Sequence, residues 1–126
     1  MRLSRVLACN LLALASVACS DVLGNASPGD VTVTASTESV VIENGRSAKI
    51  VHMVVDAAMA ARINWAPCVA EDCPGIMPGE SLSISTDEIF GFGESDQVIV
   101  YWWHVYTTLT GEVYRGEIRA VCVTYS

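Results

Sequence analysis

Three sets of side chains in this sequence are able to do chemistry: five cysteines, two histidines and a cluster of aromatic residues. Cys68 and Cys73 share one proline-rich stretch, and their Cys-x4-Cys spacing differs from the Cys-x-x-Cys spacing of redox motifs. We therefore predict a structural disulfide between them, worth about 2 kcal/mol through the entropy of a short closed loop. Cys122 alternates with apolar residues, which predicts a buried, reduced thiol. A bond from Cys122 to Cys68 or Cys73 is the alternative.

The two histidines, His52 and His104, suggest a metal site because imidazole and thioether groups suit copper. Met53 is adjacent to His52, so His52, His104 and Met53 form the alternative metal-binding set. Their spacing matches no metal motif, and His52 alternates with apolar residues, which favours a histidine packed in the core. No recognisable motif pairs a nucleophile with a base. We therefore predict no cofactor and no enzymatic activity.

The aromatic cluster lies in the longest expected strand, where successive side chains point to opposite faces. Trp102, His104 and Tyr106 fall on one face, and Tyr101 and Trp103 fall on the other. We predict that Trp103 faces the core, because the opposite face carries the histidine. The face with Trp102, His104 and Tyr106 is then a candidate binding surface for a protein or glycan. This face can equally be covered by a loop or a neighbouring strand of the chain.

The N-terminal segment has the organisation of an export signal. Arg2 and Arg5 precede the apolar residues 6–18, a stretch too short for a stable membrane-spanning helix, which needs about 20 residues. A short apolar region after positive charges is typical of a signal peptide, so we predict one over residues 1–18. Residues 19–30 are rich in turn-forming residues and predict a flexible tether to one domain over residues 31–126.

The sequence Ser16-Val17-Ala18-Cys19 resembles a bacterial lipobox. That resemblance implies cleavage before Cys19 and attachment of a diacylglyceryl group to its sulfur, which would anchor the protein in a membrane of the cell envelope. A serine after the cysteine, here Ser20, further implies sorting to the outer membrane, facing the periplasm. Ser16 stands where the lipobox usually has an aliphatic residue, and the same residues fit ordinary signal cleavage. Plain secretion or a free periplasmic protein is therefore the alternative.

The elements that must position these side chains are predicted to be strands. Short runs rich in β-branched and aromatic residues recur at even spacing, and a proline-rich loop occupies residues 66–80. A helical turn or bend is expected near residues 56–60. We predict strands over residues 31–34, 38–42, 48–55, 61–65, 81–85, 97–108 and 112–125. Seven to eight short strands without a long amphipathic helix predict an all-β fold, a two-sheet antiparallel sandwich.

This layout resembles immunoglobulin-like and fibronectin type III-like sandwiches. The resemblance covers residues 31–125 and rests on strand number and spacing, because the Cys–Trp–Cys pattern of antibody domains is missing. It implies a fold and no particular activity.

The net charge of −7 and the single lysine argue against nucleic-acid binding, which requires a basic surface. We therefore predict a lipid-anchored, non-catalytic envelope module that binds a partner or serves a structural role. The alternatives are a periplasmic copper-binding protein and a carbohydrate-binding module.

Overall fold

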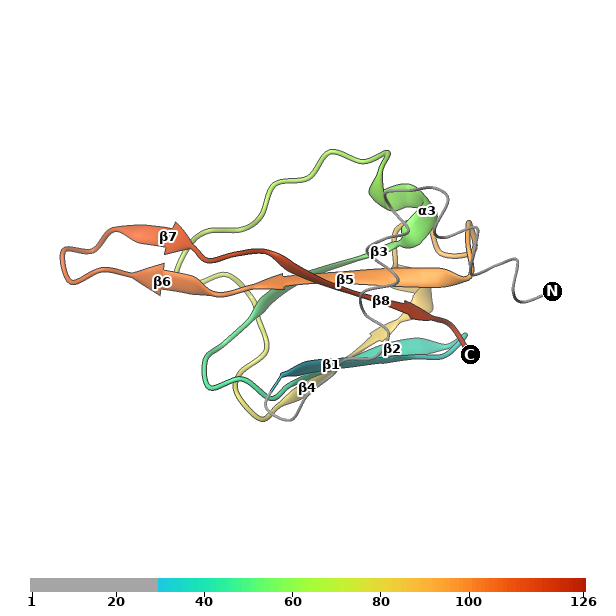
Figure 1. Cartoon of the computed structure of the whole chain (residues 1–126), viewed down its shortest axis with the longest axis horizontal. Coiled ribbons are helices and arrows are strands. Elements are labelled where there is room, and N and C mark those ends of the chain that lie inside the picture. The colour runs from blue at the N-terminus through green and yellow to red at the C-terminus, as the bar shows by residue number, and fades with distance from the viewer. Residues whose placement is uncertain (1–29) are drawn as a thin grey trace.

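The computed structural model describes residues 30–126, and nearly all regular structure within them is β (Figure 1). The strands are β1 (Val31–Ala35), β2 (Ser39–Asn44), β3 (Val51–Asp56), β4 (Ser81–Ser85), β5 (Gln97–Trp103), β6 (Val105–Thr107), β7 (Val113–Arg115) and β8 (Arg119–Thr124). Two short helical elements join them, α3 (Ala57–Ala60) and the 3-10 turn η1 (Thr86–Glu88). Neither has the length or hydropathy to cross a membrane. The predicted signal peptide, Cys19 and the tether before residue 30 lie outside the described residues.

The strands form two facing sheets and a projecting hairpin (Figure 1). One sheet has the order β1-β2-β4, the other has the order β3-β5-β8, and β6 pairs with β7. Every pairing within these sheets is antiparallel. The all-β sandwich prediction is therefore confirmed. The strand orders match strands A-B-E and C-F-G of the immunoglobulin sandwich.

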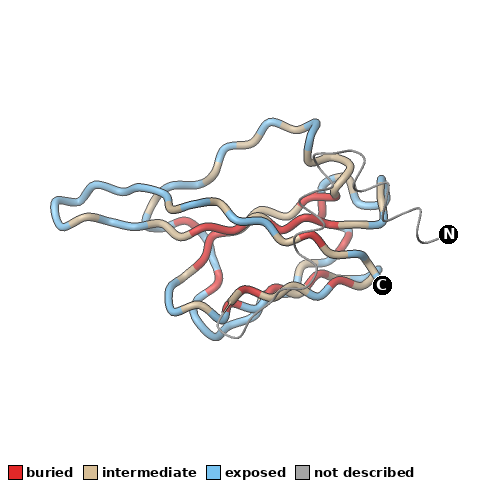
Figure 2. The backbone as a smooth tube through the Cα atoms, in the orientation of Figure 1, coloured by how far each residue is buried: buried red, intermediate tan, exposed pale blue. Residues whose placement is uncertain are grey.

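The main core lies between the two sheets, where Figure 2 shows the buried segments. Alternation along β5 points Val98, Val100 and Trp102 toward the facing sheet, which contributes Val40 and Ile42 from β2. All five side chains are buried. Burying a side chain of this size contributes about 1.5–3 kcal/mol, so this layer is the main source of stability.

A strand over residues 61–65 was predicted, and the structure shows none there. A short helix, α3, precedes this segment, as the alanine-rich sequence suggested, and the Asp56 carboxylate caps it by accepting from the Ala58 N–H. Ile63 and Trp65 then pack against the outer face of the β3-β5-β8 sheet without joining its ladder. The alternating sequence of residues 61–65 correctly indicated that Ile63 and Trp65 are partly buried, but the prediction that this segment pairs as a strand is wrong.

The single strand predicted over residues 97–108 is interrupted at His104, which separates β5 from β6. Residues 116–118 interrupt the returning strand in the same way, between β7 and β8. The Gly116 N–H donates to the His104 carbonyl, so the two breaks face each other. The β6–β7 hairpin therefore continues the β5–β8 ladder beyond the body of the sandwich, where its residues are mostly exposed (Figures 1 and 2).

Candidate binding surface on the β6–β7 hairpin

The hairpin is held in one register by its turn. The Gly111 N–H donates to the Thr108 carbonyl, and the Thr108 N–H donates to the Glu112 carbonyl. Gly111 has a φ of 91°, a left-handed conformation that suits glycine and is typical of a three-residue hairpin loop. This loop places Tyr106 directly opposite Tyr114.

The two tyrosines form a stacked, exposed pair. Their ring centroids are 5.2 Å apart with 30° between the ring planes. Tyr106 is 42% exposed and Tyr114 is 52% exposed, and Leu109 at the tip of the loop is fully exposed. Aromatic side chains with one apolar body and one polar tip are suited to interfaces, because they bury large area and still hydrogen-bond.

The tyrosine pair extends a series of rings along one face, here called the aromatic ladder: Trp102, His104, Tyr106 and Tyr114. The centroids of Trp102 and His104 are 5.6 Å apart, and those of His104 and Tyr106 are 6.0 Å apart. The Nδ1 of His104 lies 3.0 Å from the carbonyl oxygen of Lys49. A carbonyl can only accept, so Nδ1 carries the proton, and this hydrogen bond fixes the orientation of the ring.

Trp102 was predicted on the exposed binding surface, and this prediction is wrong. Its side chain is 3% exposed and belongs to the core between the sheets. The guanidinium carbons of Arg46 and Arg119 lie 5.3 and 5.5 Å from the centre of its ring, a favourable cation–π geometry. The ladder therefore runs from buried Trp102 through half-buried His104 to exposed Tyr106, and only its outer end is available to a partner.

The other face of β5 is also covered. Trp103 is 2% exposed, as predicted, and its Nε1–H donates to the Cys68 carbonyl at 3.0 Å. The ring of Trp65 lies 5.8 Å from that of Trp103. The loop between α3 and β4 thus encloses this face of the sheet, which makes it a second small core.

The predicted Cys68–Cys73 disulfide is present, with its Cα atoms 6.0 Å apart. It closes the part of the loop that contacts Trp103, because the Cys68 carbonyl accepts from that indole. Cys122 is buried, as predicted, but it is disulfide-bonded, so the prediction of a reduced thiol is wrong.

Removing the loop disulfide should lower stability by a moderate amount. We expect the double variant Cys68→Ala/Cys73→Ala to lose about 2 kcal/mol of unfolding free energy, the value for closing a short loop. Urea denaturation monitored by tryptophan fluorescence measures this. The double variant is the correct comparison, because a reductant would also act on the bond of Cys122. Unchanged stability would mean that the loop is held by its packing on Trp103 alone.

The alternative metal set is not brought together. His52 lies directly opposite Trp102, on the face toward the main core, whereas Met53 packs with the clusters on the opposite face. Burial lowers the pKa of His52, which keeps its imidazole neutral at pH 7. Within residues 30–126 no group of three or more His, Cys, Asp or Glu side chains is arranged to hold a metal ion.

Sequence reasoning missed Tyr114, Arg46 and Arg119. Tyr114 was recoverable, because a glycine at the third position of the hairpin loop fixes its pairing with Tyr106. Arg46 lies in the loop after β2 and Arg119 begins β8, so no local pattern places them over one ring.

No protein-family model matches the chain. Searches of curated proteins and of solved structures found no match either. The candidate surface is therefore defined by its geometry alone, as the outer end of the aromatic ladder with Leu109 at its tip.

Proposed function

We propose that this protein is a non-catalytic binding module, tethered to the bacterial cell envelope through Cys19, that captures a protein partner with its β6–β7 hairpin. One observation carries the proposal: the stacked, exposed tyrosine pair on a hairpin that projects from the sandwich. Tyr106, Tyr114 and Leu109 are exposed together at the outer end of the hairpin, and exposed apolar groups gathered in this way mark interaction surfaces. Binding of a partner would remove their apolar surface from water, which favours the complex.

A protein is favoured over a glycan as the partner because of how the rings are arranged. Sugar binding commonly uses an open aromatic face, but each tyrosine ring here has one face covered by the other. The remaining edges, the two hydroxyl groups and the apolar tip at Leu109 resemble the anchors of protein interfaces.

Changing the tyrosine pair should weaken capture of the partner without unfolding the domain. We expect Tyr106→Ala/Tyr114→Ala to weaken partner binding by about 2 kcal/mol, or about thirtyfold, as loss of an aromatic anchor does. The partner is first obtained in cells by placing a photo-crosslinking residue at position 106. Position 107 is the matched control, because Thr107 lies on the same strand but faces the opposite side.

Equal crosslinking from positions 106 and 107 would argue against the hairpin face as the site. Crosslinks to a glycan and none to protein would favour the carbohydrate-binding alternative. Binding that is unchanged by the double variant would contradict the proposal outright.

The anchor is tested at the mature N-terminus. We expect mass spectrometry of the protein from bacterial membranes to find residues 1–18 removed and Cys19 carrying a diacylglyceryl group. The control variant Cys19→Ser should be recovered without lipid. An unmodified Cys19, or a Cys19 peptide linked by a disulfide to the Cys122 peptide, would contradict lipid anchoring and favour plain secretion, because a lipidated sulfur cannot form that bond.

A further inference from the structure

Strand β3 is an edge strand, because it pairs with β5 on one side only. Along its other side, backbone groups lie open between two short contacts with other segments of the chain. At one end the Ile50 and Ile76 backbones exchange two hydrogen bonds, and at the other the Asp56 N–H donates to the Phe90 carbonyl. Backbone groups alternate in direction along an antiparallel strand. His52 therefore points its N–H and C=O the same way as Ile50 and Asp56, away from β5.

Val54 follows the same alternation, but the parallel bridge between Val55 and Phe90 sets the Phe90 N–H against the Val54 C=O. Three backbone groups therefore remain open at this edge: the N–H and C=O of His52 and the N–H of Val54. Within residues 30–126, neither bridging segment donates to or accepts from the His52 N–H, the His52 C=O or the Val54 N–H. Natural proteins blunt such edges with proline, lysine or a bulge, and β3 has none of these between its two bridges. The open stretch is about 20 Å long at the usual rise of a strand, which is room for about five residues.

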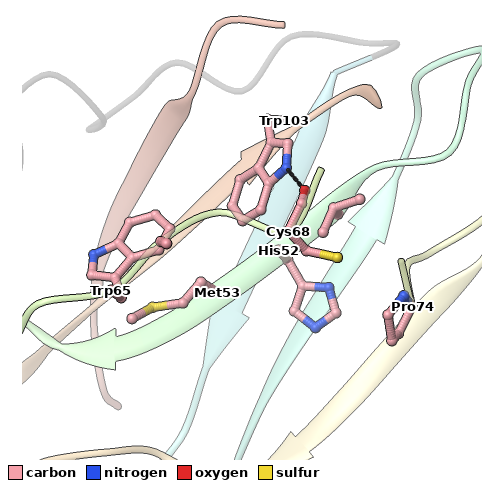
Figure 3. Close-up of a pocket in the computed structure, with 8 residues that line it drawn as sticks. His52, Met53, Trp65, Cys68, Pro74 and Trp103 are labelled. Carbon is pink, nitrogen blue, oxygen red and sulfur yellow. Dashed lines mark hydrogen bonds between the residues drawn. The ribbon is translucent and has the colours of Figure 1, made fainter. Parts of the chain in front are cut away.

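A pocket of about 270 Å³ lies beside this edge (Figure 3). Figure 3 shows Trp65 and Met53 on one side of it and Pro74 on the other, with His52 and Cys68 between them. Val51, Ala66 and Trp103 complete the apolar part of its lining. The pocket therefore has the size and chemistry to take one apolar side chain.

We propose that the β3 edge binds an extended peptide segment of a partner protein, which adds as a fourth strand to the β3-β5-β8 sheet and places one apolar side chain in the pocket. Strand addition supplies main-chain hydrogen bonds for affinity, and a pocket beside the edge supplies side-chain specificity. The three open backbone groups, the N–H and C=O of His52 and the N–H of Val54, are complementary to the N–H and C=O groups of a peptide, and a sugar or metal ion would leave most of them unpaired.

A flexible segment fits this edge better than a second copy of the domain. The bridges at Ile76 and Phe90 bound the open stretch at both ends, so a rigid strand with a domain behind it would meet them. A short peptide passes between them. This surface is separate from the aromatic ladder, and its function does not depend on the hairpin.

The experiment uses the mature protein and a series of capped seven-residue peptides, alternating threonine and valine, with leucine, phenylalanine or aspartate at the centre. We expect the amides of His52 and Val54 to exchange with solvent about tenfold more slowly at saturation, as measured by NMR. The leucine or phenylalanine peptide should bind about tenfold or more tightly than the aspartate peptide, as burial of one apolar side chain implies. A peptide methylated on alternate backbone nitrogens should not bind.

A matched pair of variants tests the pocket. Ala66 is exposed and lines the pocket, so Ala66→Trp should fill it and abolish binding without disturbing the core. Glu71→Trp adds the same ring elsewhere on the loop, outside the pocket lining, and should bind peptide normally. Thermal melts check that both variants fold.

Several results would overturn the inference. They are no binding by any peptide of the series, undiminished binding of the methylated peptide, and normal binding by Ala66→Trp. Protection of the His52 and Val54 amides that rises with protein concentration alone would identify a second copy as the occupant and overturn the partner-peptide assignment. None of these results tests the tyrosine pair, so the proposal that the β6–β7 hairpin binds a partner would still stand on the crosslinking experiment.

Discussion

Replacing Trp103 with alanine should lower the free energy of unfolding by about 3–5 kcal/mol, the usual penalty for truncating a buried tryptophan. Trp103 joins three parts of the fold: it sits on β5, packs in a cluster with Val51 of β3 and Cys73, and donates its indole N–H to Cys68. The alanine variant loses the ring contacts and leaves the Cys68 carbonyl without its donor. Urea denaturation of the purified domain measures the loss.

Trp103→Phe separates the two contributions. Phenylalanine keeps most of the apolar contact with Trp65 and loses only the indole hydrogen bond, so we expect a loss of about 1–2 kcal/mol. A loss of less than about 1 kcal/mol in Trp103→Ala would mean that the disulfide loop does not pack on the sheet as described.

The sequence predicted which face of β5 each tryptophan occupies, but it did not predict that both faces are covered. Alternation correctly assigned Trp102 and Trp103 to opposite faces, and an isolated sheet would expose one of them. The structure covers both faces, one with the β1-β2-β4 sheet and the other with the loop after α3. The length of that loop was the available signal, because long loops without regular structure are uncommon in compact domains unless they cover or bind something.

Local signals predicted some elements well. Strand β4 was predicted with the bounds that it has, because Ser81–Ser85 alternates and follows a proline-rich loop. The Cys68–Cys73 bond was also predictable, because both cysteines lie in one short loop whose spacing suits no redox motif.

The register of the β6–β7 hairpin depends on the number of residues in its loop, which the Thr110-Gly111 turn signal alone does not fix. A two-residue loop at Thr110-Gly111 would pair Tyr106 with Arg115, whereas the three-residue loop pairs it with Tyr114. One residue of slip moves every side chain of a strand to the other face. The tyrosine pair, and with it the candidate surface, therefore depends on the left-handed conformation of Gly111.

The second large effect is expected at Asp56, a fully buried carboxylate. Its Oδ1 accepts from the Ala58 N–H and from the Ser95 hydroxyl, both at 2.8 Å, and its Oδ2 accepts from the Ser95 N–H at 3.2 Å. One side chain thus connects the end of β3, the start of α3 and the loop before β5. We expect Asp56→Ala to lose about 3 kcal/mol, from the loss of a helix cap and from donors left without an acceptor.

The charge of Asp56 also acts on Tyr125, whose pKa is raised to about 12 by burial first and by the nearby carboxylate second. The Tyr125 hydroxyl is buried and makes no hydrogen bond within the described residues. An unfolded tyrosine has a pKa of about 10. Between about pH 10 and 12 the unfolded chain therefore releases a proton that the folded chain keeps, so stability is present below this window and falls as the pH rises through it.

Asp56→Asn distinguishes the two roles of the side chain. The amide keeps one oxygen that can accept at the cap, so we expect a smaller loss of stability at neutral pH than in Asp56→Ala, about 1–2 kcal/mol. Because the negative charge is gone, the pKa of Tyr125 should move down toward its ordinary value, and stability should fall less steeply between about pH 10 and 12. Tyrosinate absorbance and urea denaturation across this range measure the two effects.

Tyr125→Phe is the control, because phenylalanine has no proton to lose. In the wild type and in Asp56→Asn, it should remove the loss of stability at alkaline pH that Tyr125 causes. A Tyr125 titration that is identical in the wild type and in Asp56→Asn would show that burial alone raises the pKa and that the carboxylate acts only as a structural acceptor.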